Sequence, residues 1–293
     1  MDLSFVPAQL VSGLTTAMTL FVTASGLSLI FGVMGILNFA HGSLFMLGAF
    51  LLASLARLLG ASGVGFVAAL FIASVAVGVI GGALERWLIS RLYGKEELFQ
   101  LLFTYSLVLV MADCVRMVWG VNQQSVMRPA MLSGSFELAG ATLSHYNLLL
   151  IGVGFTIVLG LWFLLHRTRI GELIRAASQD REMLLMLGKN VRWIQTGVFA
   201  LGAFLAGLSG ALMAPLVSVV PGMDSEIIIV LFIIVVIGGL GSLAGTLVGS
   251  LVYGIAYSFT VYFFPQLALF VVAALMVITL TLRPQGLLGR RIG

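Results

Sequence analysis

Residues 227–282 read IIIVLFIIVVIGGLGSLAGTLVGSLVYGIAYSFTVYFFPQLALFVVAALMVITLTL, and none of these 56 residues is charged. A helix needs about 20 consecutive apolar residues to cross a bilayer core of about 30 Å. The stretch is therefore long enough to cross a membrane at least twice. It is uniformly apolar, unlike the short alternating strands of a transmembrane β-barrel. These residues predict a helical membrane protein.

The rest of the chain has the same character. Hydrophobic residues make up 60% of the 293 residues and charged residues only 9%, whereas a soluble domain has about 25% charged residues. Five further apolar stretches can span a membrane, the first of them twice: residues 3–56, 58–84, 98–119, 146–165 and 193–217. We therefore predict an all-α bundle of eight or nine transmembrane segments that forms a single domain over residues 1–293.

The distribution of cations predicts the orientation. Twelve of the 15 Lys and Arg residues lie in three segments, which are residues 86–95, 166–192 and 283–291. Short loops rich in Lys and Arg remain on the cytoplasmic side of a membrane, so we expect all three segments there. Residues 120–145 and 218–226 are then periplasmic loops, and counting the crossings places the N-terminus outside.

Residues 166–191 are the most informative of the basic segments. Read as one helix, they carry an apolar stripe that consists of Leu173, Ala177, Leu184 and Leu187. Two short helices hinged at residues 178–180 fit the pattern equally well. The segment is either a helix lying on lipid headgroups or a docking element for a cytoplasmic protein, and the pattern does not separate the two. As a docking element it would use Leu173, Arg175, Ala177, Asp180, Arg181, Leu184, Leu187 and Gly188.

Glycine-bearing discontinuities interrupt both long apolar ends of the chain. The first is GVMGILNFAHGS, residues 32–43, and the second is GGLGSLAG, residues 238–245. Polar groups at mid-membrane are tolerated where they face a bundle interior or a water-filled path, and transporters build substrate sites from broken helices. We expect broken helices near the centre and a substrate path lined by Asn38, His41, Ser43, Gly239, Gly241 and Ser242. The alternative is a pair of tight turns between adjacent spans.

Two further patterns concern helix packing and charge. Gly241, Gly245 and Gly249 are spaced by four residues, so we expect them on one helix face that another helix approaches closely. Asp113 and Arg116 lie one helical turn apart, and we expect a structural pair near the outer membrane boundary. The alternatives are a substrate-facing role for the pair and proton coupling by Asp113.

Signatures of catalysis and metal binding are weak. Residues 207–210 read GLSG, which resembles the short signature of intramembrane serine proteases. All three histidines precede Ser209, however, and those proteases take their base from a later span. Scattered histidines and one cysteine give no metal-ligand spacing, and topology explains the basic loops without nucleic acid. The loops are too short for a soluble domain, so we expect no enzyme and no nucleotide site, and any energy source must be a partner.

Five motifs follow one another along the chain: GLSLIFGVMGILNFAHGSLFMLGAF (26–50), RIGELIRAASQDRE (169–182), LGKN (187–190), GGLGSLAG (238–245) and RPQGLLG (283–289). In this order, over nearly the whole chain, they resemble the permease subunits of branched-chain amino acid ABC importers. The block NFAHG within the first motif favours the LivH type of subunit over its paralogous partner.

The resemblance implies a permease in the inner membrane of a bacterium that carries branched-chain or other hydrophobic amino acids. Its implied partners are a second permease subunit, two cytoplasmic ATPase subunits that bind ATP and Mg²⁺, a periplasmic binding protein and membrane lipid. Related permeases for urea, amides or aromatic acids are the alternative, and an ATP-independent secondary transporter is a further one. Both a homodimeric and a heterodimeric pore agree with the sequence.

Overall fold

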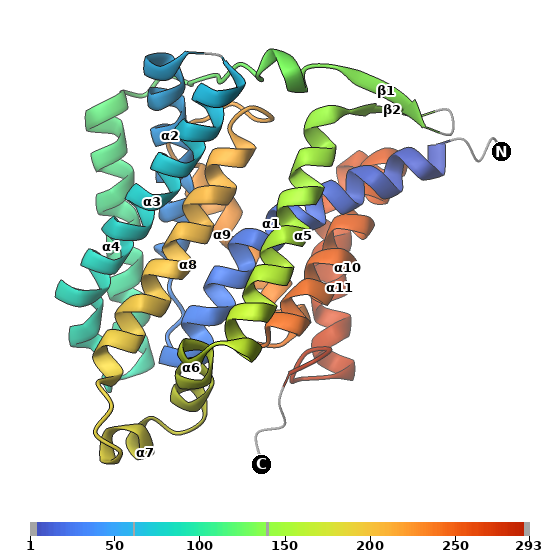
Figure 1. Ribbon diagram of the computed structural model, residues 1–293. Coiled ribbons are helices and arrows are strands. Elements are labelled where there is room, and N and C mark those ends of the chain that lie inside the picture. Colours follow the sequence, from blue (N-terminus) through green and yellow to red (C-terminus); the bar gives the residue numbers. More distant parts are fainter. Residues whose placement is uncertain (1–4, 61, 139–140, 290–293) are drawn as a thin grey trace.

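The computed structural model describes residues 5–60, 62–138 and 141–289, which form a helical bundle with one small β-hairpin (Figure 1). The α-helices are α1 (Phe5–Met34), α2 (His41–Leu59), α3 (Gly63–Trp87), α4 (Glu97–Trp119), α5 (His145–Arg167), α6 (Arg169–Gln179), α7 (Arg181–Met186), α8 (Val191–Met213), α9 (Met223–Gly238), α10 (Leu243–Phe263) and α11 (Ala268–Leu282). The 3₁₀ turns are η1 (Ile89–Leu92), η2 (Ala130–Leu132) and η3 (Pro265–Leu267), and the antiparallel strands are β1 (Ser135–Leu138) and β2 (Ala141–Ser144).

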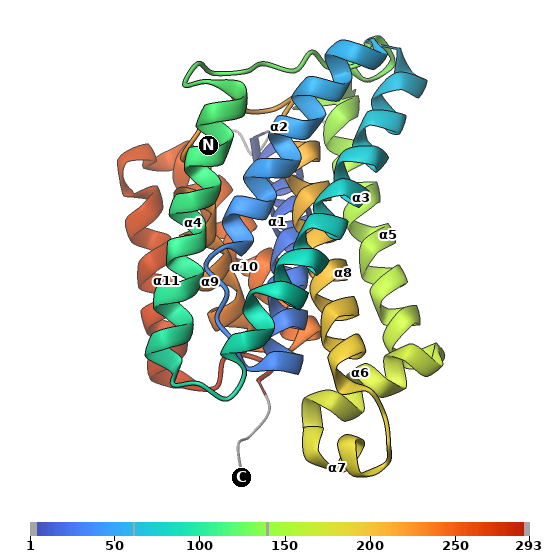
Figure 2. The same ribbon diagram turned by 90° about the vertical axis from the view of Figure 1, so that its left-hand side faces the viewer.

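Eight helical segments within the described residues are long and apolar enough to cross a membrane. They are α1, α2, α3 with η1, α4, α5, α8, α10, and η3 with α11. α9 has 16 residues and lies among them in the bundle (Figure 2). The predicted polytopic helical membrane protein is therefore confirmed.

The described residues of the three basic segments, which are 86–95, 166–192 and 283–289, belong to the same end of the bundle. One end, the basic end, carries η1, α6, α7 and the end of α11, and the other, the hairpin end, carries the β-hairpin and the start of α1 (Figure 1). Gln124 and Val219 exchange backbone hydrogen bonds of 2.8 and 2.9 Å. The two segments predicted to be periplasmic loops are thus joined to each other. The prediction that residues 218–226 form a loop is wrong for residues 223–226, which form the first turn of α9.

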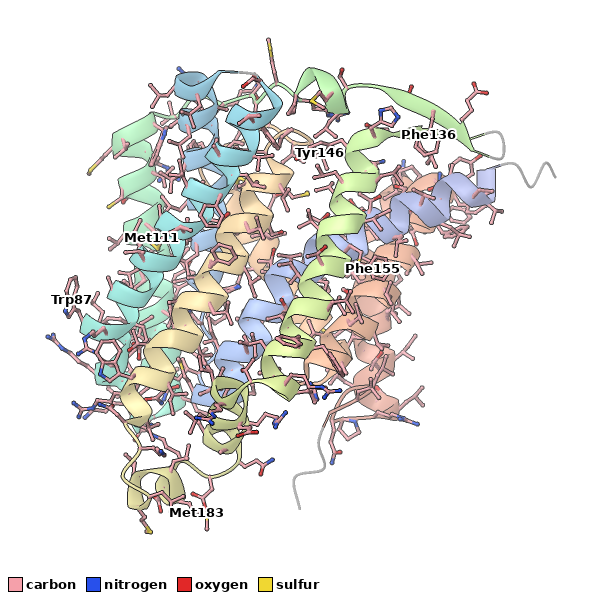
Figure 3. The ribbon with its side chains drawn as sticks, in the orientation of Figure 1. Trp87, Met111, Phe136, Tyr146, Phe155 and Met183 are labelled. Carbon is pink, nitrogen blue, oxygen red and sulfur yellow. The ribbon has the colours of Figure 1, made fainter. Side chains whose placement is uncertain are left out.

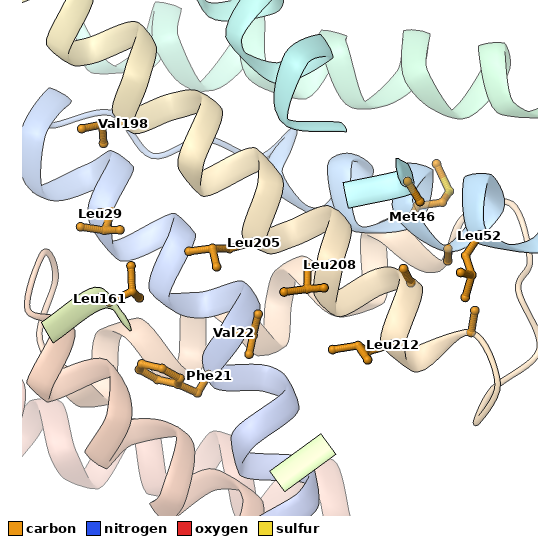
Figure 4. Packing of buried hydrophobic residues seen from close by; sticks show 14 of the residues in the cluster. Phe21, Val22, Leu29, Met46, Leu52, Leu161, Val198, Leu205, Leu208 and Leu212 are labelled. Carbon is orange, nitrogen blue, oxygen red and sulfur yellow. The ribbon is translucent and has the colours of Figure 1, made fainter. Parts of the chain in front are cut away.

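α1 runs through the centre of the bundle and packs against α5, α8, α9 and α10. Figure 4 shows how its apolar side chains lie against those of α8 in the main core, where the labelled residues include Phe21, Val22, Leu29, Leu205, Leu208 and Leu212. α1 therefore links the helices that surround it in the core.

Pairs of glycines bring helix backbones into contact across this core. A Cβ atom on Gly26 of α1 would lie 2.6 Å from the carbonyl oxygen of Gly202 in α8. One on Gly48 of α2 would lie 2.2 Å from the carbonyl oxygen of Gly207, also in α8. Helices in membranes associate through such small residues because lipid offers no hydrophobic driving force. These contacts hold α8 against both halves of the first broken helix.

A break between α1 and α2 returns the chain to the middle of the bundle. Gly35 follows the end of α1 with a φ of +67°, and the following residues run back within the bundle, where Ile36 and Asn38 are buried, before α2 begins (Figure 2). α2 starts at His41, whose ring Nε2 lies 3.0 Å from the carbonyl oxygen of Thr23. Thr23 precedes the end of α1 by eleven residues, about 16 Å along a helix axis. The first predicted discontinuity is therefore a broken helix near the centre.

The second glycine discontinuity is a tight turn at the basic end. Gly239 and Gly241 have φ angles of +108° and +76°, which favour glycine. Ser242 begins α10 by accepting a 3.1 Å hydrogen bond from the Gly245 amide. The C-terminal segment closes over the turn, because the Leu287 amide donates a 2.9 Å hydrogen bond to a carbonyl of α9. This segment follows the alternative interpretation, a turn between adjacent helices, rather than a second break at mid-membrane.

The expectation of three glycines on one helix face is wrong for Gly241, which lies before α10 and not in it. Gly245 and Gly249 do lie on α10 and face α9. A Cβ atom on Gly245 would lie 2.1 Å from the Gly238 carbonyl oxygen, and one on Gly249 would lie 2.4 Å from that of Ile234. The helix that approaches closely is therefore α9 of the same chain.

Candidate functional site

Five polar side chains lie around the start of α2 inside the bundle. They belong to Thr23 of α1, to Asn38, His41 and Ser43 at the break, and to Asp224 of α9, and each is at most 1% exposed. We call them the central polar cluster. Three of the five were predicted from the sequence. Thr23 and Asp224 were missed, because neither lies in a glycine-bearing motif.

Hydrogen bonds connect the cluster to three helices. The Ser43 hydroxyl donates a 2.7 Å hydrogen bond to Asp224 Oδ2. The His41 ring is bonded to the Thr23 carbonyl oxygen, and Asn38 Oδ1 accepts a 3.1 Å hydrogen bond from the Ala40 amide, which holds the turn into α2. The side chains of the break are thus fixed against both α1 and α9.

Four atoms of the cluster have no hydrogen-bond partner among the described residues: Thr23 Oγ1, Asn38 Nδ2, His41 Nδ1 and Asp224 Oδ1. Each unpaired buried polar atom costs about 1–3 kcal/mol, so stability does not account for these four atoms. Polar groups at this depth are tolerated where they face a path through the bundle. The arrangement therefore suits contact with a polar solute.

A cavity of about 380 Å³ lies toward the hairpin end between α1, α2, α9 and α10. Its walls are mostly apolar and include Phe45, Met213 and Ile227, and the Thr16 and Tyr253 side chains also line it. Glu226 is the one charged side chain among its described lining residues. We call this space the hairpin-end cavity, and none of the path residues predicted from the sequence lines it.

A second cavity, of about 490 Å³, lies at the basic end between α1, the α5–α6 corner and the turn before α10. Gly241 and Ser242, two of the predicted path residues, line this basic-end cavity together with His166 and Arg175. Gly239 lies in the same turn but packs against the C-terminal segment, where a Cβ atom on it would lie 2.5 Å from the Gly289 amide.

The central polar cluster lies between the two cavities along α1. Residues 15–20 of α1 contribute to the hairpin-end cavity and residues 28–33 to the basic-end cavity, while Thr23 belongs to the cluster. The structure thus brings Asn38, His41 and Ser43 together in one closed layer. It leaves Gly239, Gly241 and Ser242 apart from them at the basic end.

Residues 166–191 fold as the two short helices α6 and α7 rather than as one. Asp180 interrupts the helix and caps α7, because its Oδ1 accepts a 2.9 Å hydrogen bond from the Met183 amide. Gly188, with a φ of +69°, ends the segment. The Arg175 guanidinium donates to the Leu165 carbonyl oxygen, and the Arg181 guanidinium lies 5.3 Å from the centre of the Tyr93 ring.

The predicted apolar stripe of this segment faces the chain's own core. Ala177 and Leu184 are each 5% exposed, and Leu173 packs against the same core. The expectation that these three side chains meet lipid headgroups or a partner is therefore wrong, because α6 and α7 cover α1, α5 and α8 with them. Leu187, in contrast, is exposed.

A different apolar surface of the segment is exposed, and most of its residues were not predicted from the sequence. We call it the α7 face, and it consists of Met183, Leu185, Met186 and Leu187. Met186 is the most exposed of them at 84%, and Figure 3 shows Met183 pointing away from the bundle. The interruption at Asp180 shifts the helical phase, so continuing one stripe across it selected the wrong face.

Asp113 and Arg116 form an ion pair in α4 with Oδ1 and Nη1 3.0 Å apart. It is the one ion pair found in the described ranges, and both side chains are exposed on the outside of the bundle. Neither residue lines the two cavities. The geometry agrees with the predicted structural pair and leaves the pair away from the central polar cluster.

A helical membrane bundle with a broken helix, a buried polar layer and cavities on both sides of that layer has the architecture of a transport protein. Residues 9–280 match the family described as "Branched-chain amino acid transport system / permease component", and the chain belongs to this family. The resemblance noted in the sequence is confirmed.

The similarity extends over nearly the full length of named relatives. The chain is 30% identical to the high-affinity branched-chain amino acid transport system permease protein BraD of Pseudomonas aeruginosa, over 96% of this chain and 95% of that protein. It is 26% identical to the corresponding permease protein LivH of Escherichia coli over the same shares. A solved structure titled "PsaBC from Streptococcus pneumoniae in complex with Fab" has the same fold, with a TM-score of 0.50, 14% identity and coverage of 94% and 91% of the two chains.

Proposed function

We propose that this chain is the permease subunit of an ABC importer for branched-chain or other hydrophobic amino acids, in the inner membrane of a bacterium. The hairpin-end cavity supports the proposal. Its apolar walls suit the hydrophobic side chain of such an amino acid, and the Glu226 carboxylate suits its ammonium group. The names of the relatives BraD and LivH support the same substrate class.

In this cavity the Glu226 carboxylate would accept hydrogen bonds from the substrate ammonium group. The hydroxyls of Thr16 and Tyr253 would donate hydrogen bonds to the substrate carboxylate. Phe45 and Ile227 would surround the aliphatic side chain. A volume of about 380 Å³ is within the range of small-ligand pockets, which are roughly 300–1,000 Å³. Urea or a short amide would leave the apolar walls unfilled and Glu226 without an ammonium partner.

The substrate would then pass the central polar cluster and leave through the basic-end cavity. Asn38, His41 and Ser43 would line the closed layer. Its four unpaired polar atoms could form hydrogen bonds with the charged groups of the substrate as it passes. Gly241 and Ser242 would line the exit, and Gly239 would shape its turn. Opening the layer requires α2 and α9 to separate, which breaks the bond between Ser43 and Asp224.

The energy for this movement would come from two cytoplasmic ATPase subunits, which bind the ATP and Mg²⁺, so the chain itself would have no nucleotide site and no enzymatic activity. Four exposed apolar side chains of the α7 face suit a groove of such a subunit, with the basic end in the cytoplasm. A second permease subunit would complete the pore, and a periplasmic binding protein would meet the hairpin end.

Uptake by the reconstituted complex tests the proposal. The chain is co-expressed with the second permease subunit, the ATPase subunits and the binding protein proposed here, purified as a complex and placed in proteoliposomes with ATP inside. We expect ATP-dependent leucine uptake that valine and isoleucine inhibit. Inhibition by urea, acetamide or benzoate instead would assign the chain to a related permease with that substrate. Uptake driven by an ion gradient without ATP would identify it as a secondary transporter.

A further inference from the structure

Four arginines line a cavity of about 530 Å³ at the basic end, on the side of the bundle formed by α3, η1 and α8. They are Arg86, Arg91, Arg181 and Arg192, and we call this cavity the arginine pocket. It is separate from both cavities along α1, because none of its described lining residues also lines either of them. The transport path proposed above makes no use of it.

The positive charge of the arginine pocket is not neutralised by the chain. Glu85 is the one carboxylate among its described lining residues. It is 1% exposed and accepts hydrogen bonds from the hydroxyls of Tyr93 and, at 2.6 Å, of Thr196. Burial and the neighbouring Glu85 raise the pKa of Tyr93, so its phenol remains a donor to that carboxylate. Nowhere in the described chain does a carboxylate lie within 4.0 Å of any of the four guanidinium groups.

Aromatic rings hold two of the guanidinium groups in place. That of Arg86 lies 4.5 Å from the centre of the Trp193 ring, and that of Arg181 lies 5.3 Å from the centre of the Tyr93 ring. The side chains of Arg91 and Arg192 have no hydrogen-bond partner in the described residues. A stacked guanidinium keeps its N–H groups free for a bidentate contact, and phosphate is a preferred acceptor for that geometry.

Two exposed tryptophans lie at the arginine pocket. Trp87 lines it and Trp193 lies under Arg86, and these two rings are 64% and 61% exposed on the outside of the bundle. Figure 3 shows Trp87 pointing away from the helices at this end. Exposed tryptophans mark the membrane–water interface, and the lipid-facing surface of α3 continues from there with exposed Val75 and Val79.

We infer that the arginine pocket binds the headgroup phosphate of an anionic phospholipid of the cytoplasmic leaflet. Four cations against one satisfied carboxylate favour a headgroup with net negative charge, such as phosphatidylglycerol, over a zwitterionic one. The exposed tryptophans place acyl chains beside the pocket, which a soluble phosphate ester lacks. Bound there, the lipid would join α3, α7 and α8 at the end where the α7 face is exposed.

Quenching of tryptophan fluorescence by brominated lipids tests this inference on the purified complex. Phosphatidylglycerol and phosphatidylcholine with the same brominated chains are compared in the wild type and in the double variant Arg91→Gln, Arg192→Gln, which removes two unpaired side chains and no internal hydrogen bond. The matched control is Arg169→Gln, Lys189→Gln, which removes the same charge from exposed positions of the basic end outside the pocket.

We expect the wild type and the control to bind brominated phosphatidylglycerol in preference to phosphatidylcholine. The pocket variant should bind brominated phosphatidylglycerol at least about tenfold more weakly than the wild type does. Equal quenching by both lipids in the wild type would overturn the inference. So would equal losses in pocket variant and control, which indicate general charge attraction, or displacement of the lipid by millimolar glycerol phosphate, which indicates a small-anion site.

Discussion

The Ser43 hydroxyl lies 2.7 Å from the Asp224 carboxylate, although 181 residues separate the two in the sequence. Asp224 belongs to the first turn of α9, and Ser43 belongs to the first turn of α2. The N-terminal ends of helices carry partial positive charge. Two such ends therefore stabilise the buried carboxylate where no cation lies within ion-pair distance in the described residues.

Replacing Ser43 by Ala should impair transport, because it removes the bond that closes the layer and leaves both Asp224 oxygens unpaired. We expect a stability loss of about 1–3 kcal/mol and a several-fold change in leucine uptake at equal membrane abundance. Ser74→Ala is the matched control, since that buried hydroxyl bonds only to the Leu70 carbonyl oxygen within α3. Equal uptake in the two variants would show that the bond has no part in transport.

His41→Leu and Asn38→Leu should each lower uptake, and the double variant should lower it further, because the polar lining of the closed layer is removed while its volume is filled. The measurement is initial uptake rate normalised to the amount of chain in the membrane. Wild-type rates in both single variants and in the double variant would assign these side chains to packing.

Gly48→Ala should reduce the yield of folded complex. The added Cβ atom would lie 2.2 Å from the Gly207 carbonyl oxygen, and overpacking of this kind costs about 1–3 kcal/mol. A Cβ atom on Gly160 of α5 meets no described atom within 4 Å, so Gly160→Ala should leave the yield unchanged. Thermal stability in detergent distinguishes the two, and an unaffected Gly48 variant would contradict the close approach of α2 and α8.

Glutamate substitutions at Leu184 and Met186 should separate folding from docking. Leu184→Glu buries a charge in the chain's own core, which costs several kcal/mol, so it should lower the abundance of the chain. Met186→Glu changes a side chain that is 84% exposed, so abundance should stay while ATPase co-purification is lost. Retention of the ATPase by the Met186 variant would remove the α7 face from the proposed interface.

The membrane-spanning pattern could be predicted from the sequence because it depends on the length of charge-free runs, which local composition determines. The first break was predictable for a related reason, since Asn38 and His41 are polar within an apolar run. Whether a glycine run is a break or a turn depends on packing far along the chain. The turn at Gly239 is held by the C-terminal segment, and like the break it lies in a glycine-bearing run.

The rest of the site depends on contacts that a single sequence does not contain. The role of Asp224 follows from its bond to Ser43 on a distant helix, and no spacing rule connects them. The exposed face of α7 was misassigned because a helical stripe was extended across Asp180, where the helix ends and a new one begins. Glu226 lacked a motif altogether, and only the cavity gives it a role.

Uptake kinetics of the Glu226→Gln variant bear most directly on the proposed function. With saturating binding protein and ATP, we expect the KM for leucine to rise about 10-fold or more, because a charge-assisted hydrogen bond to the ammonium group contributes about 1.5–3 kcal/mol. Glu137→Gln, an exposed carboxylate of the hairpin outside the cavity, should leave the KM unchanged. Equal kinetics of the wild type and the Glu226 variant would contradict binding of an amino acid in the hairpin-end cavity.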